Sequence, residues 1–247
     1  MKRLISNEWL KLRREKTLWF ALALHLAPVT MVIAASAMGV HQGPPEQRYF
    51  VLHNQSVFLA AIVPVIVTAV AFRVELSNRT WFEWLMLPQP RPRLLTAKVL
   101  NIGLIQLVFI ALSTVTTVVF LLTVGAGGVL IARSIGSYLI LQLGSMVVMS
   151  AAAVLLSLLL RNTLIVNIIG IAVSMITMVL MAADFSWAIP TSWTYRTGLA
   201  VLDHAAYSFP EWWNLLAGSA IWVLLSAGML LASRALCRSP AVLNAAV

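Results

Sequence analysis

Six apolar runs, each long enough to cross a lipid bilayer, constrain this chain more than any other feature. A spanning helix needs about 20 consecutive apolar residues. The runs lack the strict polar and apolar alternation of membrane β-strands, and a helix satisfies its own backbone hydrogen bonds in lipid. We therefore predict an all-α, polytopic membrane protein with six transmembrane helices, over residues 17–38, 50–72, 99–124, 134–160, 163–182 and 212–233.

Composition supports this class. Hydrophobic residues make up 61% of the chain and charged residues only 10%, whereas soluble domains carry about 25% charged residues. Six spans with their connections use most of the 247 residues, which favours a single domain, 1–247, without a soluble catalytic domain. The first run is too long for the apolar region of a cleaved signal peptide, so we interpret it as a permanent helix.

The distribution of Lys and Arg predicts the orientation. Six spans put both termini on one side, and the positive-inside rule assigns the more basic side to the cytoplasm. We therefore predict that both termini are cytoplasmic. Topology and anionic lipids also explain the net charge of +9 without nucleic acid. The more basic side holds Lys2, Arg3, Lys11, Arg13, Arg14, Lys16, Arg73, Arg79, Arg91, Arg93, Lys98, Arg161, Arg234 and Arg238, and the other side holds Arg48, Arg133 and Arg196.

Two polar segments flank the spans. Residues 1–16 would form an amphipathic helix on the cytoplasmic leaflet. Residues 183–211 are rich in Trp and Tyr, and we predict short helices in the outer interface, broken at Pro190 and Pro210. This outer segment is either an aromatic belt or an outer gate. The turn at 40–55 would be exposed, and its His41 and His53 do not have a metal-ligand spacing.

The cytoplasmic loop at 73–98 is the most distinctive segment. Each of its five basic residues would cost roughly 2.5 to 3.5 kcal/mol at the centre of a bilayer, yet its centre is dense in aromatic and aliphatic residues. Thr80 and Glu83 fit a capping box, Glu75 and Arg79 are spaced for an ion pair, and prolines follow from Pro88 onward. We predict a short helix over 80–87, followed by a stiff proline-spaced strap. An exposed apolar helix of this kind indicates a protein partner or insertion among lipid headgroups.

Other residues offer less chemistry. The middles of the spans carry no Asp, Glu, Lys or Arg, and His25 is an isolated titratable group. The chain has no Walker phosphate-binding loop. Its single cysteine, Cys237, cannot form an intramolecular disulfide and does not indicate a metal site. We predict no enzyme active site, no metal and no cofactor bound by this chain. Four polar residues on spans are candidates for a dimer interface or substrate path, with interhelical hydrogen bonding as the alternative: Asn101, Gln106, Gln142 and Asn167.

The loop resembles the signature of ABC type-2 transporter permeases. In that family a Glu follows the second span, and Leu-Pro-x-x-Arg and then Ala-Lys lead into the third. The matching positions here are Glu75, Leu87, Pro88, Arg91, Ala97 and Lys98. Residues 78–81 and 85–88 are similar to the lantibiotic (bacteriocin) immunity branch. Arg79 departs from the Gly that many members have.

The resemblance implies a permease subunit of an ATP-driven exporter in a bacterial inner membrane. Two permease subunits, identical or homologous, would bind two copies of a cytoplasmic ABC ATPase, which would hold ATP and Mg. The helix at 80–87 would couple to the ATPase, with Trp81, Trp84 and Leu85 as anchors and Glu75 and Arg79 as positioning charges. The alternative is a non-transporting membrane scaffold or sensor that recruits a cytoplasmic partner.

Overall fold

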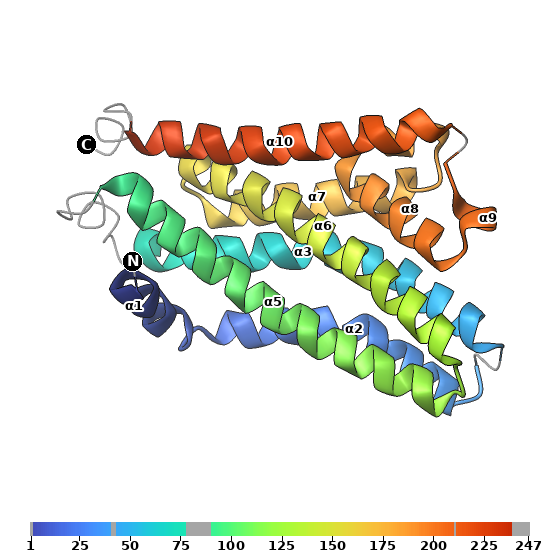
Figure 1. The fold of residues 1–247 in the computed structure, drawn as a ribbon. Helices are drawn as coiled ribbons and strands as arrows, with labels where there is room; N and C mark the ends of the chain where they lie inside the picture. Colours follow the sequence, from blue (N-terminus) through green and yellow to red (C-terminus); the bar gives the residue numbers. More distant parts are fainter. Residues whose placement is uncertain (1, 41–42, 78–89, 210, 239–247) are drawn as a thin grey trace.

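The described part of the chain is a bundle of long helices. A computed structural model describes residues 2–40, 43–77, 90–209 and 211–238 (Figure 1). Every regular element in these ranges is a helix, and six helices are long and apolar enough to cross a membrane, as predicted. These six are α2 (Lys16–Ala37), α3 (Pro45–Ser77), α5 (Arg91–Thr123), α6 (Gly128–Leu160), α7 (Thr163–Leu180) and α10 (Trp212–Arg238).

The bundle has two distinct ends. The short helix α1 (Lys2–Leu12), the last turns of α3 and α10 and the first turns of α5 lie at one end, called the α1 end below (Figure 1). The first turns of α3, α6 and α10 and the small helix α9 (His204–Tyr207) lie at the other, the α9 end. Helix α3 runs through the centre, since 72% of its most apolar stretch is buried, against 11% for α10.

Three helices are longer than the apolar runs suggested. α3, α5 and α6 contain 33 residues each, or about 50 Å, against about 30 Å of hydrocarbon. The predicted spans 50–72, 99–124 and 134–160 were therefore too short, because a helix can continue through polar residues once it leaves the lipid. In consequence the predicted turn at 40–55 is wrong beyond residue 44, and His53 is fully buried within α3 rather than near an exposed turn.

The proline-spaced strap predicted before the third span is also wrong from Arg91 onward. α5 starts at Arg91, with Pro90 as its N-cap residue and Pro92 in its first turn. Proline is tolerated there because the first amides of a helix have no intrahelical acceptor to lose. The connection between α3 and α5 is therefore shorter than the loop predicted over 73–98. The helix predicted over 80–87 lies outside the described residues.

The outer segment 183–211 is folded into the bundle rather than laid flat on the interface. A 3₁₀ turn, η1 (Asp184–Ala188), leads into α8 (Pro190–Leu202), which begins at Pro190 as the sequence suggested. α8 packs along α6, and Thr194, Tyr195 and Leu199 are buried. Small residues explain the packing, because a Cβ on Gly198 would lie only 2.8 Å from the carbonyl oxygen of Ser137.

Candidate coupling site

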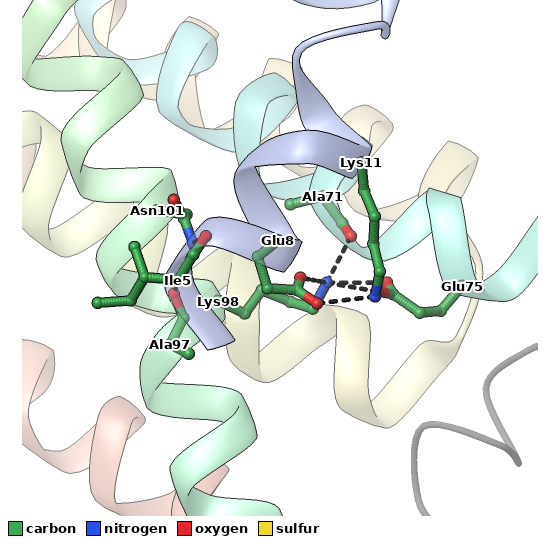
Figure 2. A network of polar contacts seen from close by, with 8 residues as sticks. All are labelled: Ile5, Glu8, Lys11, Ala71, Glu75, Ala97, Lys98 and Asn101. Atoms are coloured by element: carbon green, nitrogen blue, oxygen red, sulfur yellow. Dashed lines mark hydrogen bonds and ion pairs between the residues drawn. The ribbon is translucent and has the colours of Figure 1, made fainter. Parts of the chain in front are cut away.

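A buried lysine joins three helices at the α1 end. The Nζ of Lys98, in the second turn of α5, donates hydrogen bonds to Glu8 Oε2 of α1 at 2.7 Å and to both carboxylate oxygens of Glu75 of α3 at 2.8 Å. A fourth bond runs to the carbonyl oxygen of Ala71 at 2.9 Å (Figure 2). Lys98 and Glu75 are each only 1% exposed, so this contact is an interior part of the fold.

Lys11 completes the group at its exposed edge. Its Nζ donates to Glu8 Oε1 at 2.8 Å and to Glu75 Oε1 at 3.2 Å. Glu8, Lys11, Glu75 and Lys98, called the quartet below, thus carry two negative and two positive charges, whose sum is zero. Balanced charge is what makes burial tolerable, because an isolated ion taken out of water loses several kcal/mol of hydration.

The electrostatics of α1 reflect this balance. Burial alone would raise the pKa of Glu8, but the ammonium groups of Lys98 and Lys11 hold it below its ordinary value of 4.5. Burial would lower the pKa of Lys11, but Glu8 and Glu75 raise it above 10.5. Both shifts favour the charged forms, so Glu8 and Lys11 stay ionised near neutral pH.

A neutral side chain fixes α1 beside the quartet. Asn101, one turn after Lys98, donates from Nδ2 to the carbonyl oxygen of Ile5 at 2.9 Å (Figure 2). The ring of Phe72 lies 5.5 Å from Lys98 Nζ on the apolar side, a distance suited to a cation–π contact. α1 is therefore held against α5 by a hydrogen bond to its backbone and by the ion pair between Glu8 and Lys98.

These contacts also explain the local sequence. Positions 94, 95, 97 and 98 of α5 share one face. Leu94 and Leu95 pack there with Phe72 in one core cluster, and Ala97 is also buried. Lys98 follows on the same face and reaches between α1 and α3. Because this face of α5 packs toward the interior, Lys98 is also directed inward. There its ammonium group contacts the carboxylates of Glu8 and Glu75.

The predicted coupling residues fall into two groups. Glu75 and Lys98 lie together in the quartet, and Arg91 is the first residue of α5. Glu75 was predicted to pair with Arg79, whereas the described contacts join it to Lys98 and Lys11. Seven predicted residues lie outside the described part of the chain: Arg79, Thr80, Trp81, Glu83, Trp84, Leu85 and Pro88.

The four polar span residues lie at three separate places in the bundle. Asn101 binds α1, as above. Gln106 joins α5 to α3 and α6, since its Nε2 donates to Ser150 Oγ at 3.1 Å and to the carbonyl oxygen of Pro64 at 3.4 Å. Gln142 is buried beside Gln106 and His25 at a small cavity of about 10 Å³. Asn167 lies apart on α7, with an Oδ1 that has no hydrogen-bond partner among the described residues.

Sequence reasoning missed two members of the quartet, Glu8 and Lys11. Glu8 is 90 positions from Lys98, so no local spacing relates them. One signal was available, because Glu8 is the only acidic residue in the first 14 positions of a strongly basic segment. A basic helix on the membrane surface is attracted to anionic lipids, and an acidic residue weakens that attraction. Its presence therefore indicates a specific basic partner.

Comparison with known proteins assigns a family to this arrangement. No curated protein and no solved structure matches the chain. The family described as ABC-2 family transporter protein matches residues 4–187, which include most of α1, both ends of the α3 to α5 connection and five of the six long helices. The chain therefore belongs to the ABC-2 transporter family, as a multi-pass membrane component whose family implies association with an ABC ATPase.

Proposed function

We propose that this chain is the membrane-spanning permease subunit of an ATP-driven exporter and that a separate ATPase binds the connection between α3 and α5. The observation that supports the proposal is the quartet. It bonds the last turns of α3, the first turns of α5 and helix α1 to one another. A force applied to the 78–89 connection would therefore act on three helices together.

The balance of charges suits this mechanical role. A surface ion pair contributes little and is easily exchanged for water. In contrast, Lys98 and Glu75 are buried, and separating them would expose an unpaired charge to an apolar interior. In this proposal ATP-driven closure of the ATPase moves α1, α3 and α5 as one unit and opens an outward route.

The test is ATP hydrolysis in a reconstituted complex. The chain is expressed with its cognate ATPase, purified and placed in lipid nanodiscs, and stimulation of the ATPase by the permease is measured. Glu75→Gln leaves Lys98 with a weaker acceptor and unbalances the quartet, so we expect stimulation to fall while the ATPase still binds. Trp84→Ala in the predicted anchor helix should weaken the association itself, by about 2 kcal/mol if Trp84 is a hot spot.

Glu15→Gln is a matched control. Glu15 precedes α2 at the α1 end, outside the quartet, and its substitution removes the same charge. Equal stimulation in the wild type, Glu75→Gln and Trp84→Ala would contradict the exporter proposal. A salt-sensitive interaction with a partner that hydrolyses no ATP would instead favour the scaffold or sensor.

We further propose that the exporter removes an amphipathic substrate, such as a peptide antibiotic, from the membrane, which is the role of the lantibiotic immunity branch that the loop resembles. A second permease subunit, the same or homologous, and two ATPase copies would complete the assembly. Survival of cells challenged with a lantibiotic should rise when the chain and its ATPase are expressed together. A Walker-motif variant of the ATPase should abolish the protection, and equal survival without the permease would exclude this cargo.

A further inference from the structure

A charged cavity opens at the α9 end, far from the quartet. Its volume is about 680 Å³, within the range of small-molecule sites. Four segments enclose it: the first turns of α3, the first turns of α6, the end of α8, and α9. Gly127, Val129 and Leu130 form one wall, and Leu202 contributes to another. The hollow is therefore built by elements that are distant in sequence and is not a groove along one helix.

Charges of both signs line this cavity without pairing. Glu46, Asp203 and Arg133 all lie on its wall. Asp203 accepts hydrogen bonds from the amides of Ala205 and Ala206, at the start of α9. Among the described residues, neither the Glu46 carboxylate nor the Arg133 guanidinium has a hydrogen-bond or ion-pair partner. The cavity thus separates the opposite charges of Glu46 and Arg133, which would attract each other more strongly at a shorter distance.

Arg133 differs from the other arginines of this end. Arg48 donates from Nε to the carbonyl oxygen of Gly43 at 2.8 Å, and Arg196 donates to Ser186 Oγ at 3.0 Å. Both therefore serve the fold. Arg133 has no such contact within the described ranges. Arg133 is solvent-exposed on the cavity wall, so its guanidinium is available to an anionic group that enters the cavity.

An aromatic pair closes the inner side. The rings of Phe50 and Tyr207 stack at 5.6 Å between centroids. They separate this cavity from a second one of about 270 Å³, which Arg196 lines. The stacked rings offer an apolar and π-rich face next to the charged wall, a combination that suits an amphiphile with a charged headgroup.

We propose that this cavity binds the headgroup of a zwitterionic phospholipid, with the phosphate at Arg133 and the ammonium near Glu46 and Asp203. Such a headgroup carries a negative phosphate and a positive ammonium group a few ångströms apart. It can therefore bind Arg133 and the nearby carboxylates at the same time. The cavity lies at the end of the spanning helices, where headgroups concentrate. Val129, 71% exposed at its rim, and Leu130 offer contacts to the start of the acyl chains. The proposal does not depend on the ATPase.

Lipid retention in the full chain tests it. The protein is incorporated into nanodiscs of equal parts phosphatidylethanolamine and phosphatidylglycerol, released in the gas phase, and its retained lipids are identified by native mass spectrometry. We expect preferential retention of phosphatidylethanolamine. Soluble glycerophosphoethanolamine should compete for the site and glycerophosphoglycerol should not, which would assign recognition to the zwitterionic headgroup.

Single neutralisations locate the site. Arg133→Gln and Glu46→Gln should each lower the preference about two- to fivefold, the effect of one exposed ion pair. Arg14→Gln, at the α1 end, and Glu211→Gln, which does not line the cavity, remove the same charges and should leave the preference unchanged. Equal retention of both lipids by the wild type, or equal loss in the controls and the cavity variants, would overturn the proposal.

Discussion

At the scale of single residues, Lys98 has the largest predicted effect on stability. Lys98→Met would leave two carboxylates, Glu8 and Glu75, with Lys11 as their only described counter-charge. Removing one partner from a buried pair typically costs about 3–5 kcal/mol. We therefore expect a clear fall in the melting temperature of the purified chain, measured by tryptophan fluorescence. Lys16→Met, which removes an exposed positive charge at the first residue of α2, is the control and should have little effect.

The double variant Lys98→Met with Glu75→Met tests the physical reason. It leaves Glu8 and Lys11, which remain bonded at 2.8 Å and sum to zero charge. Apolar replacements of a buried pair are often nearly neutral for stability. Most of the stability lost in the single variant should therefore return. If the double variant is as unstable as the single one, charge imbalance is not the cause.

The shifted pKa values of α1 predict a broad pH plateau. The contribution of Glu8 is fully present above its ordinary pKa of 4.5 and is lost as the pH falls through its lower folded-state pKa. That of Lys11 is fully present below 10.5 and is lost as the pH rises through its higher folded-state pKa. A spin label at Asn7→Cys, with Cys237→Ser, should show constant mobility between these values and rising mobility beyond both. Release of α1 near pH 7 would contradict this assignment.

At the scale of elements, the α6 to α8 contact depends on glycine. In Gly198→Ala the new Cβ would lie 2.8 Å from a backbone carbonyl oxygen, which cannot rotate away. Overpacking of this kind costs about 1–3 kcal/mol. Gly103→Ala on α5 is the matched control, because nothing lies within 4 Å of its Cβ and alanine favours a helix by roughly 0.5–1 kcal/mol. Thermal unfolding should separate the two, and equal melting temperatures would refute the close packing.

The elements also show what sequence could and could not predict. Apolar runs predicted the six helices because lipid demands length and hydrophobicity. They misplaced ends such as Pro45 and Arg91, because polar turns can continue a helix beyond the lipid. The burial of α8 was missed because its tryptophan and tyrosine suggested an interface, while the decisive feature is the close approach at Gly198. Likewise the Glu8 to Lys98 bond depends on how α1 and α5 pack, which no local pattern contains.

At the scale of the whole molecule, basic residues gather at one end of the bundle. Lys11, Lys98 and Arg238 lie on helices whose ends meet at the α1 end in Figure 1. Arg13 directly follows α1 and Arg161 directly follows α6. In the described residues of the α9 end the basic side chains of Lys and Arg are those of Arg48, Arg133 and Arg196. By the positive-inside rule we predict that the α1 end faces the cytoplasm. This orientation is also the one that the exporter proposal needs, because ATP and an ATPase are cytoplasmic.

Labelling of single cysteines in intact cells tests the orientation. In a Cys237→Ser background, Ser208→Cys at the α9 end should react with a membrane-impermeant maleimide from outside, because Ser208 is exposed. Asn7→Cys on α1 is also exposed, so it is a matched probe for the opposite end, and it should react only after the cells are made permeable. Labelling of Asn7→Cys from outside would reverse the topology. The α3 to α5 connection would then face away from ATP, and the exporter proposal would fail with it.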